Sequence, residues 1–133
     1  MYKRQDIAKE VVSVEEAPSA TKDAADNVKL NNVTNLTALN GDAKKIFEQL
    51  VEKGEKFDVT VLDPPRKGCE KESLDYAIKL SEKAIVYVSC NPSTLARDLK
   101  YLHENGFTTR YIQPVDMFCH SYHIESVAWL EKN

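Results

Sequence analysis

The sequence predicts an α/β fold built around parallel β-strands. Two observations support this prediction: short apolar, β-branched runs alternate with stretches of helical period, and polar side chains stand at the ends of several of those runs. At 133 residues the chain has room for one domain and not comfortably for two. Its apolar fraction of 42% is enough for a buried core and excludes most disordered classes.

The first half of the chain contains two predicted strand and helix pairs. Residues 11–14 have the β-branched density of a buried strand, and the apolar spacing over 19–31 predicts a helix. A weaker strand pattern over 36–39 is followed by an amphipathic helical pattern over 43–53. Gly54 is expected to end that helix.

The second half continues the alternation and has the stronger strand patterns. Pro64 and Pro65 cannot donate to a strand ladder, so they end the first of these strands abruptly. In order, we expect a strand over 57–62, a helix over 72–80, a strand over 84–89, a helix over 94–104, and strands over 108–115 and 124–130.

Composition excludes several classes of protein. The 18 Lys and Arg against 21 Asp and Glu give a net charge of -3, so any polyanion site is a local patch. No run approaches the roughly 18 apolar residues of a membrane span, and no secretory signal is present, so we expect no membrane association and a cytoplasmic location. Cys69, Cys90 and Cys119 lack the paired spacing of disulfide frameworks and closed metal sites, so no metal is expected.

Three acidic residues follow predicted strands, where open parallel sheets bind ligands. Glu15 is well placed to bind a ribose diol, although a surface carboxylate is the more frequent role of such a residue. Asp42 could contact an adenine amino group or equally cap the helix that begins after it. Asp63 is more specific, because the two prolines that follow would aim its side chain.

Cys90 stands at the end of the strand with the strongest pattern, directly before a predicted helix start at Asn91-Pro92-Ser93. The partial positive charge of a helix N-terminus favours a thiolate, which is the reactive form of cysteine. Most strand cysteines are buried and inert, but the position of Cys90 at the ligand-facing end of the strand argues against that role.

A late cluster contains His120, His123 and Glu125. A carboxylate in an apolar closing strand is costly to bury without a partner or a task, and a general base is one such task. We expect His120 to serve structural hydrogen bonding. The cluster lacks the ligand spacing of a zinc site.

Four segments together resemble the RNA 5-methyluridine methyltransferases: residues 63–68 (DPPRKG), 88–99 (VSCNPSTLARDL), 115–118 (VDMF) and 123–127 (HIESV). The resemblance extends from about residue 6 to residue 129. Within the family the chain looks most like the bacterial enzymes that methylate uracil C5 in large-subunit ribosomal RNA, and the tRNA-acting relatives come next. It implies a Rossmann-like class I methyltransferase fold, an RNA substrate with rRNA favoured over tRNA, and a monomer.

The resemblance also implies residue roles. Cys90 matches the nucleophile that adds to uracil C6, and Glu125 matches the base that removes the C5 proton. The methyl donor is S-adenosylmethionine, with Glu15 on its ribose, Asp42 near its adenine and Asp63 between the cofactor and the target base.

Two departures from the family pattern bear on these expectations. Cys119 stands where the family usually has proline, which would loosen a turn near the expected base. The family's first strand and glycine-rich loop are absent before residue 6, so residues 1–5 are interpreted as foreign or truncation-derived and 6–133 as a partial catalytic domain. Two strands would then lack a ladder partner, and the isolated chain is expected to be weak or inactive. An iron-sulfur cluster is expected only in upstream regions of some family members.

Three other functions are compatible with parts of the pattern. The first is a tRNA uracil-C5 methyltransferase or another base methyltransferase of the same fold. The second is a non-catalytic domain that only binds a nucleotide or RNA. The third, a cysteine hydrolase using Cys90 and His123, would need no cofactor and would not depend on Glu15.

Overall fold

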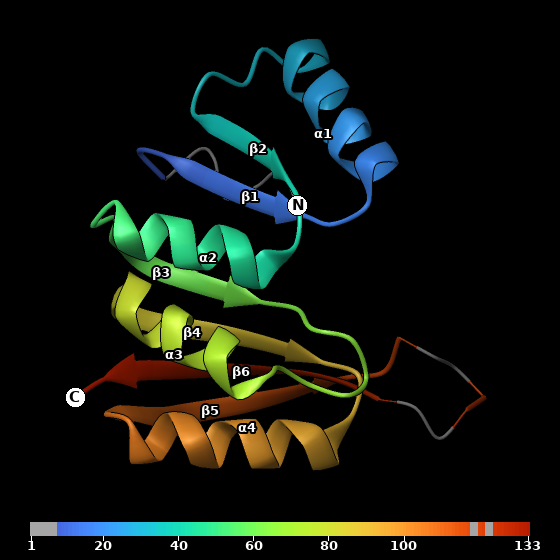
Figure 1. The fold of residues 1–133 in the computed structure, drawn as a ribbon. Coiled ribbons are helices and arrows are strands. Elements are labelled where there is room, and N and C mark those ends of the chain that lie inside the picture. The colour runs from blue at the N-terminus through green and yellow to red at the C-terminus, as the bar shows by residue number, and fades with distance from the viewer. Residues whose placement is uncertain (1–7, 118–119, 122–123) are drawn as a thin grey trace. The chain divides into compact units, whose positions relative to one another are not determined.

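The computed structural model describes residues 8–117, 120–121 and 124–133. They divide into two compact units, the first up to Gln49 and the second from Leu50 onward. The α/β alternation predicted from the sequence is present throughout (Figure 1). Within the described residues, no helix combines the length and the apolar character that a membrane span requires.

The first unit is a parallel strand pair with a connecting helix. Strand β1 (Val11–Glu15) leads through helix α1 (Pro18–Leu30) to strand β2 (Leu36–Asn40). The two strands pair in parallel, from Val11 opposite Leu36 to Glu15 opposite Asn40. Helix α2 (Ala43–Glu52) begins in this unit.

The second unit contains a four-stranded mixed sheet in the order β3-β4-β6-β5 (Figure 1). Strands β3 and β4 are parallel, whereas β6 runs antiparallel to both β4 and β5. Its elements are β3 (Phe57–Leu62), α3 (Lys71–Leu80), β4 (Ser81–Ser89), α4 (Pro92–Glu104), β5 (Phe107–Val115) and β6 (Glu125–Lys132).

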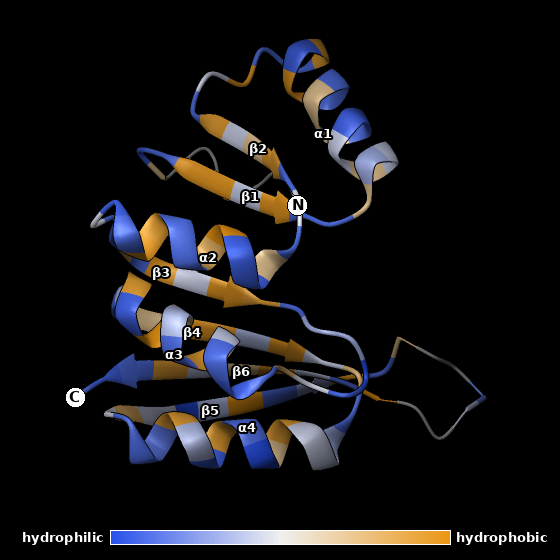
Figure 2. Ribbon diagram, in the orientation of Figure 1, coloured by the Kyte–Doolittle hydropathy of each residue, from blue (hydrophilic) through white to orange (hydrophobic). Residues whose placement is uncertain are grey.

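The core of the second unit lies where α3 and α4 meet β4, β5 and β6. Figure 2 shows apolar residues concentrated in the strands, while polar and apolar stretches alternate along the helices. This is the pattern of helices that cover a sheet with one face only. The largest fully buried side chains include Tyr87, Phe107, Leu80, Ile85, Leu102 and Leu130.

The main boundary difference from the sequence prediction is at β4, which begins at Ser81 instead of residue 84. Glu82 and Lys83 interrupt the apolar run and hide this part of the strand in the sequence. Ser81 is nevertheless buried, pairs with Phe57 and forms a hydrogen bond of 2.7 Å to the carbonyl of Ala77. The helix therefore passes into the strand without a loop.

The described strands form two separate sheets, not one. Among the described residues, β1 has the single strand neighbour β2, and β3 has the single strand neighbour β4. The expectation that a missing strand leaves β1 and β3 without a ladder partner stays a prediction.

Candidate functional site

Asp63 and Cys90 lie at the same edge of the four-stranded sheet. Asp63 follows the last residue of β3, and Cys90 follows the last residue of β4. The two strands are parallel, with Leu62 paired to Tyr87, so both carboxyl ends point to this edge. Asp63 is exposed and Cys90 is half-buried, so both side chains can reach a ligand.

Strand β6 brings Glu125 to that edge from far along the chain. The antiparallel ladder ends where Ser126 pairs with Ser89, Glu125 is the first residue of β6, and Cys90 directly follows β4, so both residues lie at the end of this ladder. On its other side Glu125 pairs with Val115. The sheet edge thus gathers a carboxylate, a thiol and a second carboxylate from three strands.

The turn that contains Cys90 is closed by its two neighbours. Ser89 Oγ accepts a hydrogen bond of 3.1 Å from the Asn91 amide and donates one of 3.0 Å to the Asn91 carbonyl. Asn91 Oδ1 accepts from the Ser93 amide at 3.0 Å and caps α4, which begins at Pro92, within the helix start that the sequence predicts. Cys90 therefore sits at a fixed position before the positive end of a helix dipole.

Cys69 is a different kind of thiol. It is a neighbour of Asp98 and Tyr87, and burial raises its pKa from 9.0 to about 11. The Tyr87 hydroxyl and Arg97 oppose that increase, whereas Asp98 adds to it. Cys69 is thus held as an unreactive thiol near neutral pH.

Asp98 is a buried carboxylate that the sequence analysis did not single out, although it lies within one of the motifs. It accepts hydrogen bonds from the hydroxyl of Tyr87, from the Cys69 amide at 2.8 Å and from Arg97 Nε at 2.8 Å. The sign of this role in the sequence is its position, since an aspartate stands between Leu95 and Leu102 on the buried side of α4.

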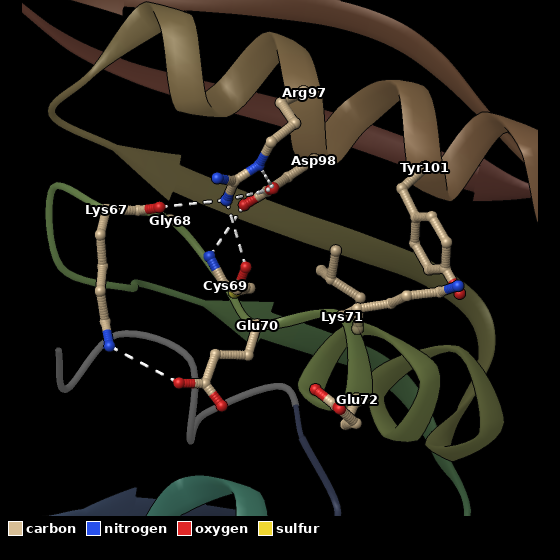
Figure 3. A pocket seen from close by; sticks show the side chains of 10 residues that line it. Lys67, Gly68, Cys69, Glu70, Lys71, Glu72, Arg97, Asp98 and Tyr101 are labelled. Carbon is tan, nitrogen blue, oxygen red and sulfur yellow. Dashed lines mark hydrogen bonds and ion pairs between the residues drawn. The ribbon is translucent and has the colours of Figure 1, made fainter.

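An open cavity of about 550 Å³ lies beside this carboxylate, between the loop after β3, the start of α3 and one side of α4. Figure 3 shows Lys67 and Glu70 on one side and Tyr101 with Lys71 on the other. The Lys71 ammonium lies 5.3 Å from the centroid of the Tyr101 ring. The cavity is lined by as many cationic as acidic side chains, so it is not a positively charged groove.

In the first unit, Glu15 and Asp42 lie at the carboxyl end of the parallel pair. Glu15 is the last residue of β1, and its Oε1 accepts from the Ala17 amide at 3.0 Å. Asp42 Oδ1 accepts from the Lys45 amide at 3.0 Å, so the helix cap that the sequence allowed for Asp42 is present. Asn40 Nδ2 donates to the Glu15 carbonyl at 3.0 Å and fixes the strand ends to each other.

Part of the late cluster lies outside the described residues. This applies to Cys119 and His123, and hence to the expected loosening of the turn and to a Cys90–His123 pair. His120 is described, and its φ of 65° is in the left-handed region.

A family model described as tRNA (uracil-5-)-methyltransferase matches residues 4–133. The chain belongs to this family. It is 48% identical over 124 residues to an RNA methyltransferase of Bacillus cereus. The match covers 93% of this chain and 27% of that protein. An RNA methyltransferase of Clostridium tetani is 49% identical over 120 residues, covering 90% of this chain and 26% of the relative. The chain therefore spans about a quarter of the length of these relatives.

Solved structures agree with the family and with the fold. The tRNA (uracil-54, C5)-methyltransferase of Pyrococcus abyssi, in complex with S-adenosyl-L-homocysteine, matches with a TM-score of 0.78 and 32% identity. That match covers 91% of this chain and 28% of the archaeal protein. Precorrin-6y C5,15-methyltransferase of Geobacter metallireducens matches with a TM-score of 0.71 at 16% identity, over 92% of this chain and 67% of that one, and bears on the fold alone. The Rossmann-like α/β fold predicted from the sequence is confirmed.

Proposed function

We propose that this chain is part of the catalytic domain of an S-adenosylmethionine-dependent RNA (uracil-C5) methyltransferase. The observation that carries the proposal is the meeting of Asp63, Cys90 and Glu125 at one edge of the sheet, in a member of this family. Within the chain, residues 6–133 form the partial domain, and the family match extends over them.

The proposed chemistry begins with Cys90. Uracil C5 is a poor nucleophile, so the thiolate Sγ first adds to C6 and moves the ring electrons toward C5. S-adenosylmethionine, when bound, supplies an electrophilic methyl group for that carbon. Glu125 then accepts the proton from C5, the electron pair re-forms the C5–C6 double bond, and the Sγ–C6 bond breaks. Asp63, exposed at the same edge, lines the pocket for the target base.

The residues at the carboxyl ends of β1 and β2 fit part of the methyl donor. Glu15 carries an exposed carboxylate at a strand end, the group that binds a ribose diol in doubly wound sheets. Asp42 is exposed too, and one of its oxygens caps α2. We propose that these two side chains hold the nucleoside part of S-adenosylmethionine.

The proposed substrate is RNA, with ribosomal RNA favoured over tRNA because, within the family, the chain resembles the bacterial rRNA enzymes most. The P. abyssi relative named above is a tRNA enzyme, so tRNA is the alternative. We further propose that the isolated chain is weak or inactive, since β1 and β3 each have one strand neighbour among the described residues.

Covalent trapping tests the proposal. RNA that contains 5-fluorouracil carries a fluorine at C5 that a base cannot remove, so the adduct to Cys90 should persist through denaturing electrophoresis. The experiment uses a longer protein that includes this chain, with Cys90→Ser as the inactive variant and Cys69→Ala as the matched control. We expect an adduct with the unchanged protein and with Cys69→Ala. We expect none with Cys90→Ser. A protein that binds S-adenosylmethionine and RNA yet forms no adduct would instead be a binding module.

A further inference from the structure

One side of α4 contacts the loop between β3 and α3. The contacts come from Asn91, Thr94, Arg97 and Asp98, whose spacing of three or four residues puts them on one side of a helix. Each of the four side chains bonds to a main-chain group of the loop. The main chain of the loop is therefore held directly by side chains of α4 and its cap.

The first two contacts are at the end of α4 that is next to Cys90. Asn91 Nδ2 donates to the carbonyl of Arg66 at 3.2 Å, and Thr94 Oγ1 donates to the same carbonyl at 3.1 Å. Asn91 also caps α4 with its other side-chain atom. One residue thus connects the Cys90 turn directly to the loop that begins at Asp63.

The other two contacts hold the far end of the loop. Arg97 Nη2 donates to the carbonyls of Lys67 at 3.0 Å and Cys69 at 3.2 Å, while its Nε and Nη2 both lie 2.8 Å from Asp98 Oδ1 (Figure 3). Asp98 Oδ2 accepts from the Cys69 amide at 2.8 Å. Gly68, between the two carbonyls, has a φ of +77° and leaves room for the guanidinium.

Rigid chain joins these contacts to Asp63. Pro64 and Pro65 are the two residues between Asp63 and Arg66, and proline fixes its backbone φ. A shift of the Arg66 carbonyl would therefore be transmitted to Asp63. Asp98 itself cannot move easily, because its side chain is buried (1% exposed) and accepts a hydrogen bond from the hydroxyl of buried Tyr87.

We propose that Arg97 is a positioning residue that fixes the loop from Asp63 to Cys69 relative to Cys90. It touches no reacting atom; it acts through the main chain of the loop. The consequence for catalysis rests on the proposed function, because it assumes that Asp63 and Cys90 face one target base. Lysine at position 97 would keep the charge but lose the planar fork that reaches two carbonyls and the carboxylate together.

Amide hydrogen exchange on the 133-residue chain tests the fixing itself. In Arg97→Lys we expect the amides of Gly68 and Cys69 to exchange on the order of tenfold faster, while those of Ile85 and Leu130 keep their rates. Arg110→Lys is the matched control, because Arg110 forms an exposed ion pair of 2.7 Å with Glu131 in the same unit. Thr94→Val leaves the Arg97–Asp98 pair intact and should also make the loop amides exchange faster.

Unchanged loop exchange in both Arg97→Lys and Thr94→Val would overturn the proposal. An equal increase at the loop and strand amides would also overturn it, because that result indicates general destabilisation. The trapping rate on 5-fluorouracil RNA then tests the catalytic consequence in the longer protein. Arg97→Lys should slow adduct formation by about tenfold with RNA affinity kept, and an adduct rate equal to that of Arg110→Lys would contradict the positioning role. If the unchanged protein forms no adduct, the proposed function fails, while the exchange result still decides whether Arg97 fixes the loop.

Discussion

Gly68 lies directly against the carboxylate of Asp98, so that a Cβ at residue 68 would stand 2.6 Å from Asp98 Oδ2. It would stand equally close to Arg97 Nη2. Gly54 has a similar φ of +75°, but apart from its own chain neighbours no atom of the described residues lies within 4 Å of its Cβ position. The two glycines therefore separate backbone strain from crowding.

Alanine at these two positions should destabilise the chain to different extents. Both variants place a Cβ in the left-handed region, which costs about 1 kcal/mol of unfolding free energy. Gly68→Ala must also displace the Arg97–Asp98 pair, for an additional loss of about 1–3 kcal/mol. Urea unfolding of the two variants measures the difference. Equal losses would show that the loop can move away from α4 at little cost.

Asp98→Asn should be among the most destabilising substitutions in the second unit. An amide at this position cannot accept all the hydrogen bonds that Tyr87, Cys69 and Arg97 donate to the carboxylate. We expect a loss of about 3 kcal/mol in unfolding free energy. Asp75→Asn, which alters the part-buried bond of 2.5 Å from the Tyr101 hydroxyl, is the control and should cost less. A loss below about 1 kcal/mol for Asp98→Asn would mean that the buried network is readily replaced.

The raised pKa of Cys69 predicts a loss of stability at high pH. Below pH 9 the thiol is protonated in both states, so its full contribution to folding is present. Above 9.0 the unfolded chain releases the proton while the folded chain holds it up to about 11, so stability falls as the pH rises between these values. Burial and the bond to Asp98 also raise the pKa of Tyr87, which acts in the same direction. The urea midpoint of unfolding, measured from pH 8 to 11, should fall less steeply in Cys69→Ala than in the unchanged chain. Identical slopes would contradict the raised pKa of Cys69.

Removal of the proposed base should trap the reaction on ordinary RNA. In Glu125→Gln the addition of Cys90 and the methylation of C5 can proceed, but the C5 proton remains and the thiol cannot leave. We expect a covalent protein–RNA complex with unmodified uridine in the longer protein, observed by denaturing electrophoresis and mass spectrometry. Rapid turnover by Glu125→Gln would assign the base to another group. Glu131→Gln, on the same strand and paired with Arg110, is the control and should turn over normally.

Local pattern was sufficient to predict the elements of this chain. The range predicted for β3 agrees with the structure at both ends, and α1 and α2 agree within one residue, because their apolar spacing and capping residues are local properties. The strand β4 begins earlier than the sequence pattern predicts because Ser81 is held by residues outside the strand. It pairs with Phe57 of β3, and its hydroxyl bonds to Ala77 of α3. Burial of that kind leaves no period in the sequence.

The sequence by itself determined the α/β alternation, the strand-end positions of Asp63 and Cys90 and, through four motifs, the family. Only the tertiary structure decided that Glu125 lies at the same sheet edge as Cys90, because β6 inserts between β4 and β5 and an antiparallel register cannot be derived from one strand alone. It also decided that Cys69 is held as a thiol and that Asp98 anchors the loop from Asp63. Those properties depend on burial and on hydrogen bonds between residues about thirty positions apart, which no local pattern encodes.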